Sequence, residues 1–322
     1  MTAQISRMDV VVAAGRIEDV VVHTPLLRSD ALDALTGGEV WLKPECLQRT
    51  GSFKFRGAYN RLAAIAPEDR GGGVVAYSSG NHAQGVAFAA KLLNMPATIV
   101  MPSDAPALKV ARTRSHCAEV VFYDRLTEDR GAIAAAIAEK RSAVIVPPFD
   151  DPFVVAGQGT AGLEIARDLE AMDKTADFAV VCCGGGGLAS GVALGSGLPV
   201  VPVEPQGYDD VARSLVAGKI LAVENPGPTI CDALQTLFCS PLTFGILSEH
   251  ALPGVWVSEA EVMAAVAFAF RELKLVVEPG GSVALAAVLA GKVDVRGKTV
   301  AVLLSGGNVD AEMFTRCLRE AA

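Results

Sequence analysis

Short runs of β-branched and other apolar residues recur along the chain and alternate with longer amphipathic stretches. The runs predict strands at Val40–Lys43, Val74–Tyr77, Thr98–Met101, Glu119–Tyr123, Val144–Val146, Phe178–Cys183, Pro199–Glu204, Val255–Ser258 and Thr299–Leu304. Because nearly every position in them is apolar, these strands are typical of sheets covered on both faces. The stretches between them predict helices, one of which begins at Ser258 with capping-box spacing to Glu261. This alternation predicts parallel sheets wrapped by helices.

The number of expected strands favours two sheets, because so many strands are unusual in a single open twisted sheet. The strands between residues 74 and 146 follow one another closely, and turn-rich segments flank them. We therefore expect a small α/β domain of residues 73–148 inserted into a large discontinuous domain of residues 1–72 and 149–322. A cleft between two such domains is a favoured place for a ligand. The stretch 224–241 lacks periodicity and is expected to be a long functional loop.

Composition narrows the class of protein. Of the 322 residues, 51% are hydrophobic and 20% are charged, and the net charge is −8, as in a globular enzyme with much buried sheet. No Lys/Arg cluster indicates nucleic acid, and no run of about 18 uncharged apolar residues indicates a membrane span. Seven cysteines without a Cys-x-x-Cys pair favour free thiols over disulfides or zinc. Charges interrupt the N-terminal apolar residues, so we expect a cytoplasmic protein without a signal peptide.

Three segments carry candidate chemistry, and each is predicted to follow a strand, where ligand sites of α/β sheets gather. The first, Gly51–Ala58, places Lys54 among two phenylalanines and small residues. An amine in such an apolar position has a lowered pKa, which suits Schiff-base chemistry. On local sequence alone, a solvent-facing lysine on an amphipathic helix is the favoured interpretation, since most lysines are exposed.

The second segment is Ser78-Ser-Gly-Asn-His82, which precedes an expected helix at Ala83–Leu93. Backbone N–H groups at the start of a helix offer a site to an anion such as a carboxylate. The same residues also fit an ordinary helix cap, and the local sequence favours the cap.

The third segment is the run of four glycines, Gly184–Gly187, between an expected strand and an expected helix. It lets the backbone approach a phosphate closely at a helix N-terminus, and a tight turn alone would rarely need four glycines. A rival interpretation is a dinucleotide site. Gly184, Gly186 and Ala189 match G-x-G-x-x-[G/A], and Glu204 follows at the end of the next strand, where it could bind a ribose. This segment alone leaves the two cofactors open.

Together with Leu304-Ser-Gly-Gly-Asn308, the three segments resemble the motifs of fold-type II pyridoxal-phosphate enzymes, above all the threonine/serine dehydratases and serine racemase. The resemblance runs from His23 to Asp310, nearly the whole chain, and four motifs in this order are far more specific than one. It implies two parallel-sheet α/β domains with pyridoxal 5′-phosphate in the cleft between them. It also favours the cofactor-bearing interpretation of Lys54.

The resemblance further implies residue roles. Lys54 would hold the cofactor as a Schiff base and later take the proton from the substrate Cα, while Ser79 would face the ring from the opposite side. The residues implied to contact the cofactor are Phe53, Asn81, Gly184, Gly185, Gly186, Gly187, Leu188 and Ser305. Among them, Asn81 would meet the ring hydroxyl, Ser305 the pyridine nitrogen, and the glycines the phosphate. The residues implied to bind the substrate carboxylate are Ser78, Ser79, Asn81, His82 and Arg130.

A metal site is implied by the same resemblance. Glu204, the Tyr208 carbonyl and Asp210 lie where racemase-like members bind Mg²⁺ or Ca²⁺, and water would complete the oxygen shell. A solvated acidic turn is the alternative for so short a motif.

Two positions depart from the family pattern. The chain reads Ile230-Cys-Asp-Ala-Leu234 where many relatives read IADGL, and it has Phe149 where animal racemase has a polar residue. Both departures leave the substrate side chain open. The chain also stops soon after the last expected helix, so we expect no carboxy-terminal regulatory domain and no isoleucine inhibition through one.

We expect β-elimination from L-threonine or L-serine, giving 2-oxobutanoate or pyruvate and ammonia, in a homodimer. A serine at the ring nitrogen gives no full positive charge there, so a carbanion at Cα should be short-lived and expel the β-hydroxyl. Alternatives of the same class are serine racemisation, with Ser79 as the acid, and dehydration of another β-hydroxy-amino acid such as hydroxyaspartate. An NAD-dependent oxidoreductase is the alternative of a different class, and it leaves Lys54 and Ser305 unexplained.

Overall fold

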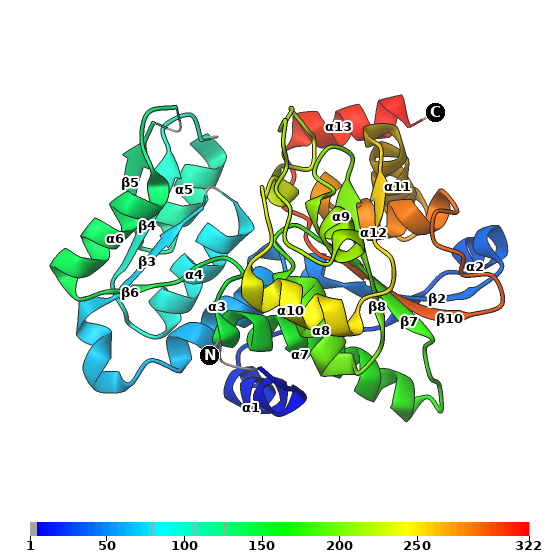
Figure 1. Ribbon diagram of the computed structural model, residues 1–322, viewed down its shortest axis with the longest axis horizontal. Coiled ribbons are helices and arrows are strands. Elements are labelled where there is room, and N and C mark those ends of the chain that lie inside the picture. Colours follow the sequence, from blue (N-terminus) through cyan, green and yellow to red (C-terminus); the bar gives the residue numbers. More distant parts are fainter. Residues whose placement is uncertain (1–4, 79, 106, 125, 322) are drawn as a thin grey trace.

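Two sheets lie side by side in this computed structural model, which describes residues 5–78, 80–105, 107–124 and 126–321 (Figure 1). The larger sheet contains β1 (Leu27–Arg28), β2 (Glu39–Pro44), β7 (Phe178–Cys182), β8 (Val200–Pro205), β9 (Val255–Val257) and β10 (Thr299–Leu304). The smaller sheet contains β3 (Val74–Tyr77), β4 (Ala97–Pro102), β5 (Glu119–Tyr123) and β6 (Val144–Ile145). Their strand orders are β1-β2-β10-β7-β8-β9 and β5-β4-β3-β6. All neighbours are parallel except β1 and β2, which confirms the predicted class.

Helices fill the connections. They are α1 (Arg7–Ile17), α2 (Asp30–Thr36), α3 (Lys54–Ala63), α4 (Asn81–Leu92), α5 (Ala107–Ser115), α6 (Arg130–Arg141), α7 (Pro152–Ala171), α8 (Gly187–Ser196), α9 (Asp210–Ala217), α10 (Pro241–His250), α11 (Glu259–Arg271), α12 (Pro279–Leu289) and α13 (Ala311–Glu320). Short 3₁₀ turns are η1 (Glu45–Leu47), η2 (Arg49–Gly51), η3 (Pro67–Gly72) and η4 (Asp232–Leu234). The capping box predicted at Ser258 is present. Apart from η4, the stretch 224–240 is irregular, as expected.

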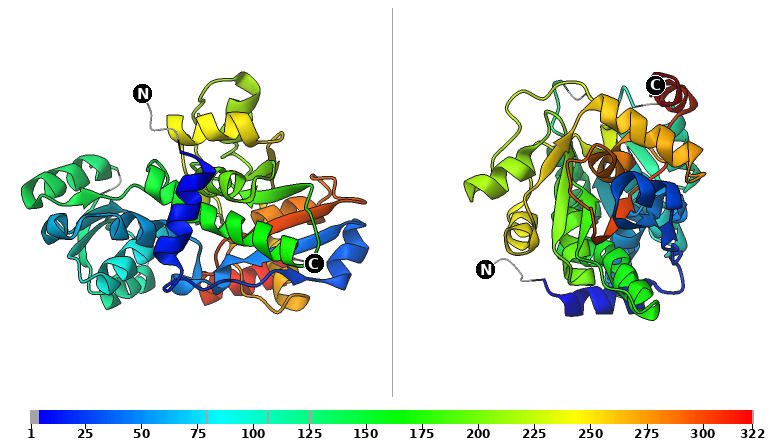
Figure 2. Two further views of the ribbon diagram at one scale, coloured as in Figure 1. Left: turned by 90° about the horizontal axis from the view of Figure 1, so that it is seen from below. Right: turned by 90° about the vertical axis from the view of Figure 1, so that its right-hand side faces the viewer.

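Both faces of each sheet are covered by helices. In the smaller sheet, Val74 and Ala76 pack in one cluster with α3 and α4, whereas Val75 between them packs with α6, as the period of two of a strand requires. In the larger sheet, α8 with α7 and α12 with α11 pack on opposite sides of the central strands (Figure 2). Every residue of β7 is buried. Burial on both faces explains the unbroken apolar runs in the sequence.

Helix α3 packs against both halves of the molecule. Its Phe55, Ala58 and Leu62 belong to the core of the smaller sheet. On its other side α3 meets α7 backbone to backbone, because a Cβ on Gly157 would lie 2.6 Å from the Gly57 Cα. Helix α3 belongs to the expected large domain by sequence but also packs on the core of the smaller sheet. The expected domains, 73–148 and 1–72 with 149–322, remain predictions.

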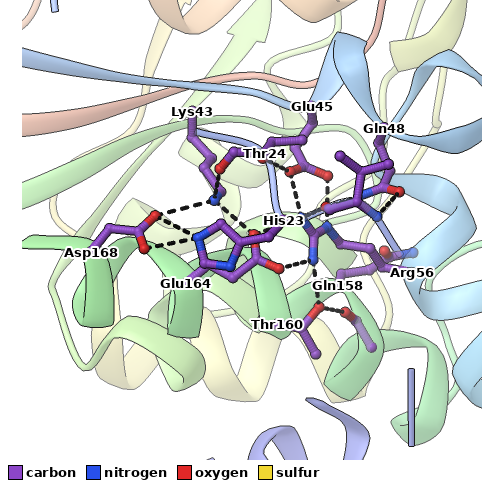
Figure 3. A network of polar contacts seen from close by, with 12 residues as sticks. His23, Thr24, Lys43, Glu45, Gln48, Arg56, Gln158, Thr160, Glu164 and Asp168 are labelled. Atoms are coloured by element: carbon purple, nitrogen blue, oxygen red, sulfur yellow. Dashed lines mark hydrogen bonds and ion pairs between the residues drawn. The ribbon is translucent and has the colours of Figure 1, made fainter. Parts of the chain in front are cut away.

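A buried network of charges anchors α3 through Arg56 (Figure 3). The Arg56 guanidinium donates to Glu45 at 2.7 Å and to Glu164 at 2.6 Å. Lys43 pairs with Glu164 at 2.7 Å, and Lys43, Glu45 and Arg56 are fully buried. The network therefore ties α3 to β2, η1 and α7 two residues beyond Lys54. Among the described residues, no helix is long and apolar enough to cross a membrane.

Candidate active site

Most of the predicted site residues line one cavity of about 1050 Å³. Those that line it are Phe53, Lys54, Ser78, Asn81, His82, Arg130, Gly184, Gly185, Gly186, Gly187, Leu188, Tyr208 and Ser305. They come from the carboxyl ends of strands in both sheets and from the helices that follow, as expected for α/β sheets. Glu204 and Asp210 do not line this cavity. Ser79 lies outside the described residues.

Lys54 is the first residue of α3, and its side chain reaches into the cavity wall. Its Nζ donates to the Pro148 carbonyl at 2.9 Å and lies 5.1 Å from the centroid of the Phe53 ring. Burial lowers the pKa of the Lys54 amine to about 8. The lysine is thus not a solvent-facing residue, and a much larger share of its amine is neutral at physiological pH than in an ordinary lysine with a pKa of 10.5.

The tetraglycine segment forms the turn between β7 and α8. Gly186 has a φ of +84°, which favours glycine, and a Cβ on Gly185 would meet the Phe149 ring at 2.5 Å. Thr243 donates its hydroxyl to the Gly185 carbonyl at 2.8 Å and so holds the turn in place. All four glycines line the cavity, and their lack of side chains at a helix start is suited to a phosphate.

The loop after β3 leads into α4, which begins at Asn81, two residues earlier than the sequence predicts. The His82 ring turns away from the loop, because its Nε2 donates to the Val146 carbonyl at 2.8 Å. Burial, and then the nearby Lys54, lowers the pKa of His82 to about 3. A neutral imidazole bonded in this way has no side-chain N–H left for a carboxylate. Any contribution of His82 to carboxylate binding must come from its backbone N–H.

The Asn81 side chain is held by residues that the sequence reasoning did not assign. Its Nδ2 donates to Glu278 at 2.6 Å, and its Oδ1 accepts from Asn308 Nδ2 at 2.8 Å. Burial raises the pKa of the Glu278 carboxyl to about 8. The sequence signal for Glu278 is weak, since an acid before Pro279 and two glycines is typical of any helix start.

Ser305 follows β10 and is nearly inaccessible to solvent. Its carbonyl accepts from Phe53 N at 3.1 Å, and its own N–H donates to the Gly281 carbonyl at 3.1 Å. Ser305 is therefore placed next to Phe53 by backbone hydrogen bonds, and its hydroxyl lies beside the Cys182 thiol in the cavity wall.

Two more cations line the cavity beyond Lys54. The Arg130 guanidinium, at the start of α6, lies 5.5 Å above the Tyr77 ring. Lys109 on α5 forms an ion pair with Asp232 of η4. This ion pair connects α5, beside the smaller sheet, to η4 in the larger unit. Lys109 is not among the site residues that the sequence predicts.

Of the residues of the expected metal site, Glu204 and Asp210 lie outside the cavity, whereas Tyr208 lines it. Both oxygens of Glu204 accept backbone hydrogen bonds, from Val211 N at 3.0 Å and Ala212 N at 2.8 Å. Both oxygens of Asp210 are buried without a hydrogen-bond partner among the described residues, and burial raises its pKa to about 7. Within the described ranges, no group of three or more His, Cys, Asp and Glu side chains is arranged to hold a metal ion.

The cavity fits pyridoxal phosphate on several independent grounds. It presents an amine of lowered pKa, a glycine turn at a helix start, a fixed amide and a hydroxyl from four separate segments. A dinucleotide fits less well, because the expected ribose ligand Glu204 does not line the cavity.

Comparison with known proteins agrees. The family described as "Pyridoxal-phosphate dependent enzyme" matches residues 17–306. The chain is 46% identical over 316 residues to the L-threo-3-hydroxyaspartate ammonia-lyase of Pseudomonas sp, which covers 97% of this chain and 98% of that protein. It is 39% identical over 317 residues to the serine racemase of Schizosaccharomyces pombe, with 97% of each chain covered. The crystal structure of the threonine deaminase from T.th. shares 43% identity, with a TM-score of 0.89 over 95% of this chain and 99% of that one.

These matches confirm the predicted family and pyridoxal phosphate as the cofactor, and they set the oxidoreductase interpretation aside. The chain belongs to the fold-type II pyridoxal-phosphate enzymes, in the group of threonine dehydratases, hydroxyaspartate ammonia-lyases and serine racemases, and it is a pyridoxal-phosphate dependent ammonia-lyase.

Proposed function

We propose that the chain converts L-threo-3-hydroxyaspartate to oxaloacetate and ammonia by β-elimination. The observation that carries this proposal is the pair of cations, Lys109 and Arg130, in the wall of the cavity. The Pseudomonas hydroxyaspartate ammonia-lyase, at 46% identity, supports the same substrate. Threonine and serine, which the sequence analysis placed first, become the second choice.

The candidate substrates differ in the number of carboxylates that the cavity must bind. The start of α4 offers N–H groups for one carboxylate, which every amino acid has. A second carboxylate in the substrate needs further cations, and charge-assisted hydrogen bonds to Lys or Arg are the strong ones. The methyl group of threonine would leave Arg130 without a substrate partner and Lys109 with Asp232 alone.

The residues assigned to the cofactor and to the Cα proton have separate roles. The tetraglycine turn and Leu188 hold the phosphate, and Asn81 and Ser305 contact the ring. When bound, the cofactor supplies an electron sink for the bond that breaks at Cα. Lys54, once its amine is free, takes the Cα proton, and the Pro148 carbonyl within 2.9 Å keeps that amine aimed into the cavity.

The experiment is a substrate panel with matched variants. We expect L-threo-3-hydroxyaspartate to have a higher kcat/KM than L-serine or L-threonine. Lys109→Ala should lower kcat/KM for hydroxyaspartate by about tenfold or more, as for the loss of a hydrogen bond to a charged group, with little effect on serine. The exposed Lys91→Ala is the control. A preference for threonine, or an equal loss on all substrates in Lys109→Ala, would contradict the proposal.

Arg130→Ala separates two roles for that residue. If Arg130 binds the second carboxylate, only hydroxyaspartate loses kcat/KM. If it binds the carboxylate common to all amino acids, as the resemblance implies, serine and threonine lose it equally.

We also propose a divalent cation at Asp210, with Glu204 and the Tyr208 carbonyl. The two unpartnered buried oxygens of Asp210 support it, since oxygen ligands are what Mg²⁺ and Ca²⁺ prefer. At a hundredfold excess over Kd, either cation should raise the free energy of unfolding of the chelator-treated protein by about 2.7 kcal/mol. Its unfolding temperature should rise accordingly. Asp210→Asn should abolish this effect. An unfolding temperature that neither cation changes would refute the site.

A further inference from the structure

Glu278 is a buried carboxyl in the cavity wall that the mechanism above does not use. It is the residue before α12, yet its side chain does not cap that helix. Instead it accepts the hydrogen bond from Asn81 Nδ2 at 2.6 Å, and only 3% of the residue is exposed. Burying a carboxyl costs free energy of folding unless it is hydrogen-bonded or paired with a charge. The position of Glu278 beside Asn81 therefore calls for an explanation.

A chain of hydrogen bonds fixes the orientation of the Asn81 amide. The Thr50 carbonyl can only accept, so the group that Asn308 presents to it at 2.7 Å must be its Nδ2. The same Nδ2 donates to Asn81 Oδ1, and this leaves Asn81 Nδ2 to donate to Glu278. The second N–H of Asn81 Nδ2 remains for the cavity.

Close packing holds Glu278 against this amide. A Cβ on Gly306 would lie 2.2 Å from Glu278 Oε1 and 3.2 Å from Asn81 Nδ2. The Glu278 N–H also donates to the Gly306 carbonyl at 3.0 Å. Glu278 is therefore enclosed between Asn81, which is assigned to the ring hydroxyl, and Gly306, which directly follows the Ser305 assigned to the ring nitrogen.

We propose that Glu278 is a positioning residue for the cofactor ring. With Asn308 it orients the Asn81 amide so that the free N–H donates to the ring hydroxyl oxygen, and its own charge state controls how much negative charge that oxygen carries. This inference rests on the proposed contact between Asn81 and the ring.

The surroundings of Glu278 support a change of charge near neutral pH. Burial and then Asp232 raise its pKa, Asn81 and Lys109 oppose them, and the result is about 8. The other titratable groups that face it are the thiols of Cys46 and Cys182, with pKa values raised to about 12 and about 11, so both stay neutral. Above pH 8 Glu278 becomes an anion, separated from the ring oxygen only by the Asn81 side chain. Because like charges repel, the ring oxygen then carries less negative charge.

The test is a pH titration of the visible absorbance of the holoenzyme without substrate. Negative charge on the ring oxygen favours the long-wavelength yellow band, so this band should decline in the wild type with a midpoint near pH 8. Glu278→Gln keeps an oxygen that accepts from Asn81 but cannot ionise. It should match the wild type at neutral pH and show no decline at that midpoint.

A control variant and two truncations complete the experiment. Glu259→Gln, whose carboxyl accepts from Ile230 N at 2.9 Å outside the cavity, should titrate like the wild type. Glu278→Ala and Asn308→Ala each free the Asn81 amide, so each should shift the band at all pH values and lower kcat about tenfold, with KM nearly unchanged. Because both act through Asn81, the double variant should lose little more than either single one.

Three outcomes would overturn the inference: a midpoint near pH 8 that survives in Glu278→Gln, a Glu278→Ala band identical to that of the wild type, or additive losses in the double variant. If Glu278→Ala fails to fold, the isosteric Glu278→Gln still decides. A wild-type protein that stays colourless with added cofactor would refute the proposed function itself. A yellow protein indifferent to Glu278 would refute this inference alone.

Discussion

The Lys54 amine has one carbonyl partner and little access to water, and this environment sets its reactivity. An amine attacks a carbonyl compound only in its neutral form. We therefore predict that the apoprotein captures pyridoxal phosphate at a rate that rises with pH up to about 8, the pKa of Lys54, and is constant above it. The rate is measured from the growth of the yellow band after mixing.

An ordinary lysine, with a pKa of 10.5, would give a capture rate that still climbs above pH 9 (roughly one unit past the expected plateau). Such a profile would show that burial does not lower the pKa of Lys54. Lys54→Arg is the matched control, since it keeps a cation but cannot form the yellow complex.

At the residue scale, the sequence predicts groups that belong to a local motif. The tetraglycine turn was identified in this way, whereas Lys54 and Ser305 were identified only because four such motifs together resemble a known family. Glu278 was missed because its partner Asn81 is 197 positions away, and no local pattern records that contact. The direction of the His82 ring was likewise invisible, because it depends on a carbonyl 64 positions further along the chain.

At the scale of elements, the turn between β7 and α8 tests the phosphate assignment. Gly185→Ala should weaken cofactor binding by at least about tenfold, or ~1.4 kcal/mol, because its Cβ would meet the Phe149 ring at 2.5 Å. Binding is measured by titrating the apoprotein with the cofactor. Gly245→Ala in α10, which has no neighbour within 4 Å of the added Cβ, should bind normally. Equal affinities in the two variants would argue against this turn as the phosphate site.

The buried network that anchors α3 makes a second prediction at this scale. Arg56→Met leaves the buried Glu45 without its cation and Glu164 with Lys43 alone, so the free energy of unfolding should fall by about 3–5 kcal/mol. The exposed pair of Arg316 with Glu320 gives the control, because Arg316→Ala should cost under about 1 kcal/mol. Denaturant unfolding measures both, and similar small losses would show that the network contributes little.

The elements themselves were largely predictable. Each expected strand overlaps an observed one, because strands buried on both faces give unbroken apolar runs. β1 was missed because it has only two residues, too few for any period. Helix α4 starts before the expected residue because Asn81 and His82, polar in sequence, are buried in the cavity wall.

At the scale of the whole molecule, side chains from both units meet across the cavity. Lys109 with Asp232 and Asn81 with Glu278 are two such contacts, and residues 232–238, which include η4, line the cavity beside them. We predict that the cofactor and substrate together slow amide hydrogen exchange in residues 224–240. Unchanged exchange there, with slowed exchange at the start of α4, would show that this stretch does not respond to ligands. The expected homodimer remains a prediction that light scattering can test.

The position of α3 has a consequence for how the protein melts. One helix contributes apolar side chains to the core of the smaller sheet and a glycine seam to α7 of the larger unit. If either core unfolds, α3 also loses its contacts with the other core. The two units should therefore unfold cooperatively. Because the same helix begins at Lys54, the yellow absorbance of the bound cofactor should be lost at the same temperature as the calorimetric transition. The absorbance therefore reports unfolding of the whole chain.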